Sequence, residues 1–255
     1  MLLGILFAQQ INKSAKLDKE ATKKNIKAFT KIADANARLE KCQNDLLNQL
    51  QINAKRKNGL LTYHLSMFQE QYSIIRKIQF GKGRGIEEIE KIDAIQNQIK
   101  QYVELPAVTS GMIMKNSQYA ISFALMGIGG VMIKESKMNL KTASKNKAMA
   151  SAQIDSICIA LEGITQHTMI ITELLEKLGM LYMKSIKNIS IILKNNGLDS
   201  ENYSEDDINA LNVSLSLTKL IYRIINTSLL DESGNIEKES IKVIQQGRDM
   251  LKQIQ

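Results

Sequence analysis

Hydrophobic residues recur every three or four positions over most of the chain, the spacing of one face of an α-helix. The most regular run alternates steps of three and four, as the a and d positions of a coiled coil do. Its members are Ile154, Ile157, Leu161, Ile164, Thr168, Ile171, Leu175, Leu178, Tyr182, Ser185, Ile189 and Ile192. A shorter run of the same rhythm comprises Leu61, Leu65, Phe68, Tyr72 and Ile75. We therefore predict two long helices, 12–79 and 134–193, that pack antiparallel.

Helix-breaking residues divide this pattern. The glycines of residues 81–85 end the first long helix, and a shorter helix at 86–105 is expected to fold back antiparallel on it, up to Pro106. Asn195-Asn-Gly197 ends the second long helix. Ser204 with Asp207 has the spacing of a capping box, which predicts the start of a further helix.

These boundaries predict five parts. They are an apolar N-terminal segment (1–11), the N-terminal coiled-coil helices (12–106), an apolar glycine-containing tip (107–133), a long coiled-coil helix (134–197) and a C-terminal helical cap (198–255). The apolar start lacks a basic region and a clear cleavage site, so we interpret it as a docking segment and not as a signal peptide.

Composition agrees with a helical fold. One proline, no tryptophan and 5% aromatic residues do not suit a β-sandwich or barrel, which need many turns and β-rich strands. The expected fold class is all-α, an elongated antiparallel coiled-coil or helical bundle with a short apolar helical hairpin tip.

The tip is the most informative segment, because no residue from Asn116 to Ile133 is charged. A helix of that length spans about 27 Å, slightly less than a bilayer core of about 30 Å. We expect an interfacial or re-entrant segment that contacts a membrane or a partner. The alternative is an apolar helix buried in an oligomer, where its glycines allow close backbone approach. The expected contact residues are Tyr119, Ile121, Phe123, Leu125, Met126, Ile128, Val131, Met132 and Ile133.

Charge adds to this interpretation. Five lysines follow the tip and would face lipid headgroups: Lys134, Lys137, Lys141, Lys145 and Lys147. The net charge of the whole chain is +8. The basic N-terminal helix is interrupted by acidic residues and is poor in arginine and aromatic side chains, so it does not resemble a nucleic-acid-binding arm.

Residues that could carry chemistry are few. His64 and His167 lack the spacing of a helical zinc site, and we expect packed helical histidines. Cys42 and Cys158 lie at apolar helical positions and are expected to be free and buried. Gly81-Lys-Gly-Arg-Gly85 lacks the spacing of a phosphate-binding loop and is interpreted as a turn. The sequence thus predicts neither catalytic residues nor a metal or cofactor.

Three stretches carry a resemblance to a known family: Met67–Phe80, the lysine-rich region after the tip, and Thr227–Ser240. In layout and in these stretches the chain resembles a largely uncharacterised family of bacterial helical proteins. Its members have a long N-terminal coiled coil and a central glycine-rich apolar segment, which is shorter in this chain. The resemblance implies an architecture and no activity.

We therefore expect a non-enzymatic coiled-coil protein that associates with a membrane through its tip and forms homo-oligomers. It would lie in the cytoplasm or at the periphery of the inner membrane. The alternative is a soluble oligomeric scaffold, and neither nucleic acid nor a small-molecule substrate is expected as a partner.

Overall fold

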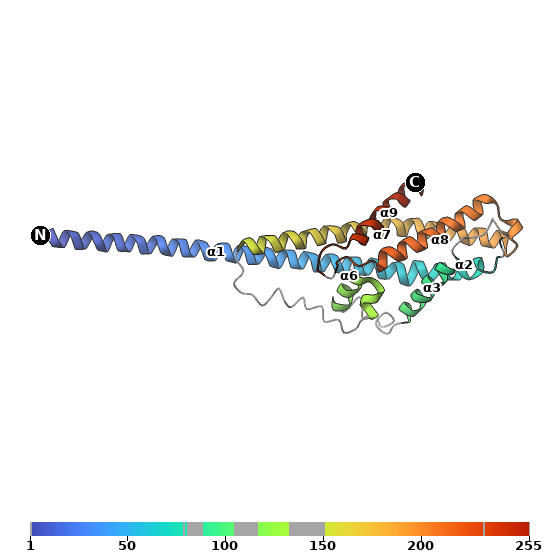
Figure 1. Ribbon diagram of the computed structural model, residues 1–255, viewed down its shortest axis with the longest axis horizontal. Coiled ribbons are helices and arrows are strands. Elements are labelled where there is room, and N and C mark those ends of the chain that lie inside the picture. Colours follow the sequence, from blue (N-terminus) through green and yellow to red (C-terminus); the bar gives the residue numbers. More distant parts are fainter. Residues whose placement is uncertain are drawn as a thin grey trace. The chain divides into compact units, whose positions relative to one another are not determined.

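The computed structural model describes residues 2–78, 80, 89–104, 117–132, 151–231 and 233–254, and the described residues are almost entirely helical (Figure 1). The fold is all-α, and the described part contains only one isolated bridge, between Leu230 and Ile236, and no strand. The chain divides into two compact units. Unit 1 comprises Met1–Leu46 and Met138–Gly163, and unit 2 comprises Leu47–Lys137 and Ile164–Gln255.

Unit 1 is formed by the first part of α1 (Leu2–Gly59) and the start of α7 (Ser151–Asn196). Helix α1 includes residues 2–11, which the sequence suggested as a separate segment. Both cysteines are free and buried in the small core of this unit, as predicted. Its members are Ala35, Cys42, Ile154 and Cys158, with Leu39 and Leu161 packed against them. An exposed ion pair of 2.7 Å joins Arg38 to Asp155 beside this core.

Unit 2 is a bundle of several helices. After α1 the chain continues as a π-helix, η1 (Leu60–Leu65), and then as α2 (Ser66–Ile75). Helices α3 (Ile89–Val103) and α6 (Ser117–Met132) come next along the described chain. The later part of α7 is followed by a short 3₁₀ helix, η3 (Ser200–Asn202), by α8 (Glu205–Asn226) and by α9 (Lys238–Ile254).

The prediction that the two long helices pack antiparallel is wrong, because their contacts advance in the same direction in each unit. In unit 1, Arg38 pairs with Asp155, and Cys42 donates a hydrogen bond to Glu162. In unit 2, Asn53 contacts Thr172 and Arg56 contacts Glu176, so α1 and α7 run parallel.

A parallel arrangement requires an even number of chain reversals between α1 and α7, and α3 provides one of them. Helix α3 does run back along η1 and α2, as predicted: Tyr72 donates a hydrogen bond to Asp93, and Tyr102 donates one to Asn58. The chain has therefore already reversed once before the second long helix begins. A heptad pattern alone does not distinguish the two directions, because both bury an a/d face.

Most of the predicted inward positions in the two heptad runs are confirmed. Leu61, Leu65, Phe68, Tyr72 and Ile75 are all buried, and so are most of the predicted positions along α7.

The π-helix explains a discontinuity in this pattern. Upstream, Leu50, Asn53, Lys57 and Leu60 are buried at steps of three, four and three, and the next run begins one residue later, at Leu61. The wider turn of η1 accommodates the extra residue.

Helix α8 returns along the later part of α7. Tyr182 and Thr218 share a hydrogen bond of 2.7 Å, and Asn196 donates one to Asp207 near the turn. The two ends of this turn are as predicted. Gly197 ends α7 with φ of 66°, and Ser204 and Asp207 form a complete capping box at the start of α8.

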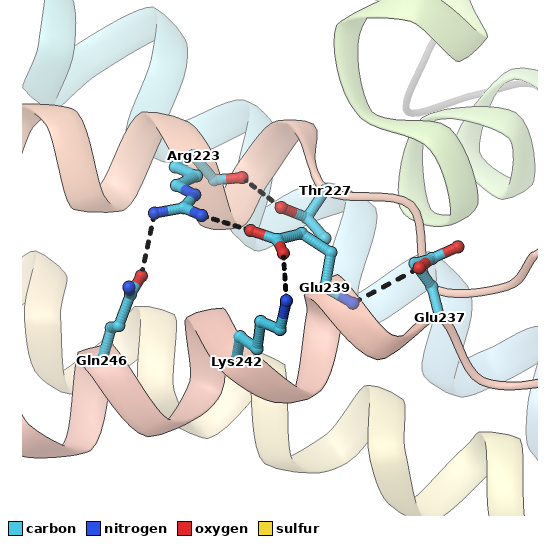
Figure 2. A network of polar contacts seen from close by, with 6 residues as sticks. All are labelled: Arg223, Thr227, Glu237, Glu239, Lys242 and Gln246. Atoms are coloured by element: carbon cyan, nitrogen blue, oxygen red, sulfur yellow. Dashed lines mark hydrogen bonds and ion pairs between the residues drawn. The ribbon is translucent and has the colours of Figure 1, made fainter.

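A polar network joins α8 to α9 (Figure 2). Arg223 forms an ion pair with Glu239 and donates a hydrogen bond of 3.1 Å to Gln246, so one guanidinium on α8 contacts two turns of α9. Lys242 also pairs with Glu239 at 3.7 Å, and Arg223 holds the pKa of Glu239 below its usual value. The network fixes the ends of the connection between α8 and α9, and this connection contacts the apolar helix α6.

Candidate functional site

The candidate site is the place where α6, which carries no charged residue, docks into unit 2. Its side chains from Ala120 to Leu125 are buried except for Ser122, which is half-buried, and Phe123 has no exposed surface. The ring of Phe123 stacks on that of Tyr102 from α3, with centroids 5.4 Å apart and planes at 23°. Offset stacking of this kind contributes about 1 kcal/mol beyond the apolar area that the rings bury.

Gly127 breaks α6 with φ of 65° and ψ of −149°, a conformation essentially confined to glycine. A Cβ atom at this position would lie 2.6 Å from the Cα atom of Asn226 and 2.7 Å from the carbonyl oxygen of Ile225. The backbones of α6 and α8 therefore approach each other as closely as they do because residue 127 has no side chain. The helix interruption also leaves carbonyl groups in the turn before Gly127 without partners along the helix.

Two of these carbonyl groups accept hydrogen bonds from other parts of unit 2. The backbone N–H of Leu229, in the connection between α8 and α9, donates to the carbonyl oxygen of Leu125 over 2.8 Å. The Nζ atom of Lys57 on α1 donates to the carbonyl oxygen of Ala124 over 2.9 Å. A cation at this place also faces the negative end of the helix dipole. Lys57 and Leu229 together thus cap α6 at its break.

Lys57 is an unusual residue in such a position, because its side chain has no exposed surface. Among the described residues, no carboxylate lies within salt-bridge distance of its Nζ atom. Burial lowers the pKa of Lys57 from 10.5 to about 7. A shift of one pKa unit corresponds to about 1.4 kcal/mol, so keeping the charged form of Lys57 in this site costs roughly 5 kcal/mol. The docked position of α6 therefore carries an electrostatic cost whenever Lys57 is protonated.

The predicted contact residues fall into two groups. Ile121, Phe123 and Leu125 are buried in unit 2 and Met126 is half-buried, so these side chains would reach a membrane or a partner only if α6 left its place. Outside the described residues lie Ile133 and the flanking Lys134, Lys137, Lys141, Lys145 and Lys147, as do the side chains of Tyr119, Ile128, Val131 and Met132. Contact of this set with a membrane stays a prediction.

Sequence reasoning missed Lys57 and Tyr102 as partners of α6. The signal for Lys57 was present, since residues 50, 53, 57 and 60 continue the inward spacing of α1, but a lysine was not expected on a buried face. The pairing of Tyr102 with Phe123 follows from no local pattern in the sequence. The contact between Gly127 and Asn226 likewise depends on tertiary structure alone.

The two histidines, which were the other candidates for a chemical role, contribute to helix packing. His167 is buried and shares a hydrogen bond of 2.6 Å with Ser240, as expected for a packed helical histidine. His64 is half-buried on the π-helix. Gly81–Gly85 lies outside the described residues. In the described ranges, no three His, Cys, Asp or Glu side chains are grouped so that they could hold a metal ion.

Among the described helices, none combines the length and the apolar character needed to cross a membrane. Comparison of the chain with protein-family models, with curated proteins and with solved structures finds no match. The resemblance to the bacterial helical family accordingly stays a prediction.

Proposed function

We propose that this is a non-enzymatic helical protein that keeps the apolar helix α6 sheltered in a bundle and releases it to a membrane surface. The observation that carries the proposal is the fully buried Lys57 at the break of α6. Undocking would return the ammonium group to water and remove the electrostatic cost of its burial, so part of the cost of exposing α6 is offset.

The size of α6 favours an interfacial placement. Its 16 residues would span about 24 Å as a straight helix, and the break at Gly127 shortens each straight part further. Such a segment can lie in the headgroup region with its apolar side chains in the acyl boundary. The lysines at 134–147, which follow α6 in the sequence, would add attraction to anionic lipid.

Co-sedimentation with vesicles of phosphatidylcholine and phosphatidylglycerol tests this function. Asp replacements of Phe123 and Leu125 would disrupt the core as well as lipid contact, because both residues are buried. Ser122→Asp is better, since Ser122 is half-buried and the change places one charge on an uncharged helix. Ser190→Asp, on an exposed position of α7, is the matched control.

We expect the wild-type protein and Ser190→Asp to sediment with the vesicles, and Ser122→Asp to bind about tenfold more weakly. A charge placed in apolar lipid costs roughly 2.5–3.5 kcal/mol at the centre of a membrane helix and less near the interface. Equal binding of the two Asp variants, or a wild-type protein that stays in the supernatant, would contradict the proposal.

The second candidate function is a soluble oligomeric scaffold, and exposed apolar residues on α7 favour it. Met180 and Ile191 each have 59% of their surface exposed, and both lie in unit 2 on one face of the helix, three turns apart. Charged residues, including Lys184 and Lys187, separate them on that face, so the apolar surface is not continuous. Light scattering on a sizing column tests this candidate function. If it is correct, the protein should form a stable oligomer whether or not lipid is present.

A further inference from the structure

Helix α7 presents one exposed face along unit 2. The apolar members of this face are Met169, Met180 and Ile191, with 37%, 59% and 59% of their surfaces exposed. They recur every eleven residues. Eleven residues complete three helical turns with only about 20° left over. The three side chains therefore form a nearly straight stripe about 33 Å long on the outside of the bundle.

Four exposed charged residues lie between these apolar residues on the same face. Glu173 and Glu176 precede the central Met180. Lys184 and Lys187 follow it. The helix dipole does not account for this order, because its effect is confined to the first and last turns of a helix, and all four residues lie at least two turns inside α7. The face is thus acidic before Met180 and basic after it.

The order of these charges is symmetric about Met180. Glu173 lies seven residues before it and Lys187 seven residues after it. Glu176 and Lys184 lie four residues before and after it. When a second copy of α7 is laid antiparallel on the first, with Met180 opposite itself, every glutamate of the face meets a lysine. A parallel pair would instead bring like charges together, which costs free energy. The face is complementary to itself in one orientation only.

The apolar residues have the same symmetry. Met169 and Ile191 lie eleven residues before and after Met180, so each would pack against the other at the two ends of the contact. At the centre, Ile52 of α1 is 52% exposed and lines a groove of about 600 Å³ together with Met180 and Met183. These side chains widen the apolar surface where the two-fold axis would pass, and methionine adapts to an irregular surface. A two-fold axis places the same patch on both sides of the contact, as in most homodimers.

The charged residues of the face are available for a partner. Within the described ranges, Glu173, Lys184 and Lys187 form no ion pair. Glu176 pairs with Arg56 at 3.0 Å, but its side chain is still 52% exposed. A carboxylate accepts more than one donor, so Glu176 can contact a second cation as well.

We propose that the face of α7 centred on Met180 pairs antiparallel with the same face of a second copy of this chain. Apolar contact supplies affinity, and the two kinds of charge pair, each present twice, select the antiparallel orientation. The contact is small, so we expect a weak dimer that dissociates between about 1 µM and 1 mM. This pairing rests on the second candidate function, the oligomeric scaffold, whose surface it names, and it does not depend on the release of α6.

Sedimentation velocity of the full chain without lipid tests the pairing. Glu173→Lys alone and Lys187→Glu alone each bring like charges together twice in the dimer, so we expect at least tenfold weaker dimerisation of each variant. An equimolar mixture of the two variants restores opposite charges across the axis and should form mixed dimers. The chain that carries both changes should dimerise as the wild type does. Glu70→Lys, at an exposed position of α2, makes the same change of charge elsewhere and is the matched control.

Crosslinking tests the register of the pair. In a Cys42→Ala, Cys158→Ala background, a short bismaleimide should join Met180→Cys to its counterpart in the second copy, because residue 180 lies on the axis. Met169→Cys should not be joined to its counterpart, because the two lie at opposite ends of the contact.

The outcomes separate this pairing from the proposed functions. Single variants that dimerise as tightly as the wild type would overturn the pairing and leave an oligomeric scaffold that uses another surface. A mixture that stays monomeric would also overturn it. A wild-type protein that is monomeric throughout the concentration range would contradict both the pairing and the scaffold. The release of α6 is measured separately, by vesicle binding.

Discussion

The Nζ atom of Lys57 donates a hydrogen bond of 2.9 Å to the carbonyl oxygen of Ala124, linking α1 to the last regular turn of α6 before its break. The two residues are 67 positions apart in the sequence, and Lys57 has no exposed surface. The hydrogen bond from Lys57 stabilises the contact with α6, whereas the burial of its charge destabilises the folded state. Replacement of Lys57 therefore separates the hydrogen bond from the cost of the buried charge.

Lys57→Met should abolish one component of the pH dependence of stability. The pKa of Lys57 is about 7 in the folded protein and near 10.5 in the unfolded chain, so between these values the unfolded state binds the extra proton. Stability of the wild type should rise through this window, by up to about 1.4 kcal/mol for each pH unit, and should gain nothing from Lys57 below pH 7. Urea unfolding at several pH values measures the slope.

In Lys57→Met this slope should disappear. At pH 6 the variant should be more stable than the wild type, because the substitution removes a buried charge. At pH 10 Lys57 is neutral in the wild type, so the variant loses only a hydrogen bond and should be equally or less stable. Lys100→Met, at an exposed position of α3, is the control and should keep the wild-type slope. Parallel pH profiles for all three proteins would show that Lys57 is not buried as a cation.

Gly127→Ala should destabilise unit 2 by about 3 kcal/mol or more. The backbone angles at this position are strained for any residue with a side chain, and the added Cβ atom would overlap the backbone of α8 at Asn226 and Ile225. Gly163→Ala should instead stabilise the protein by up to about 1 kcal/mol, because its Cβ position is open. Thermal unfolding of the two variants measures the difference, and similar melting temperatures would contradict the close contact of α6 with α8.

The π-helix η1 predicts an unusual tolerance to deletion. Removing Tyr63, which is 57% exposed, should convert η1 to a regular α-helix and bring the inward positions before and after it into one frame. We expect a loss of about 1 kcal/mol or less. Deleting the exposed Glu70 from α2 should cost several kcal/mol, because it rotates Tyr72 and Ile75 away from the core. Equal loss of stability in both deletions would argue against an inserted residue in η1.

The fold class and the inward faces of the helices could be predicted because they depend on local spacing. Leu61, Phe68 and Leu178 are buried where the heptad pattern places them, and the capping box at Ser204 is formed as its sequence indicates. The parallel direction of α1 and α7 could not be predicted, since a heptad pattern is compatible with either direction.

The docking site was less predictable than the fold. Apolarity identified α6, but it suggested contact with a membrane or a partner, whereas Phe123 is buried against Tyr102 within the chain itself. The frame of α1 places Lys57 inward, and the one-residue shift between Leu60 and Leu61 marks the π-helix. Both signals exist in the sequence. The inward position of Lys57 contradicts the general preference for apolar side chains at buried positions, and the one-residue shift contradicts the preference for regular α-helices.

Cys42 should react slowly with alkylating reagents. Burial, followed by its neighbours Cys158 and Glu162, raises the pKa of the Cys42 thiol to about 11, so very little thiolate is present at pH 8. Mass spectrometry of native protein treated with iodoacetamide should show slow modification at pH 8 that accelerates towards pH 11. Complete modification of Cys42 within minutes at pH 8, at the rate of the urea-unfolded chain, would show that the core of unit 1 is open.

The release of α6 to a membrane can be tested most directly by fluorescence quenching at one position. In a Cys42→Ala, Cys158→Ala background, an environment-sensitive dye is attached to Ser122→Cys on α6 or, as a control, to Ser190→Cys on α7. The protein is then mixed with vesicles of phosphatidylcholine and phosphatidylglycerol that carry brominated acyl chains. The account predicts strong quenching of the dye at residue 122 and little at residue 190. Equal quenching at the two positions, or none at residue 122, would contradict it.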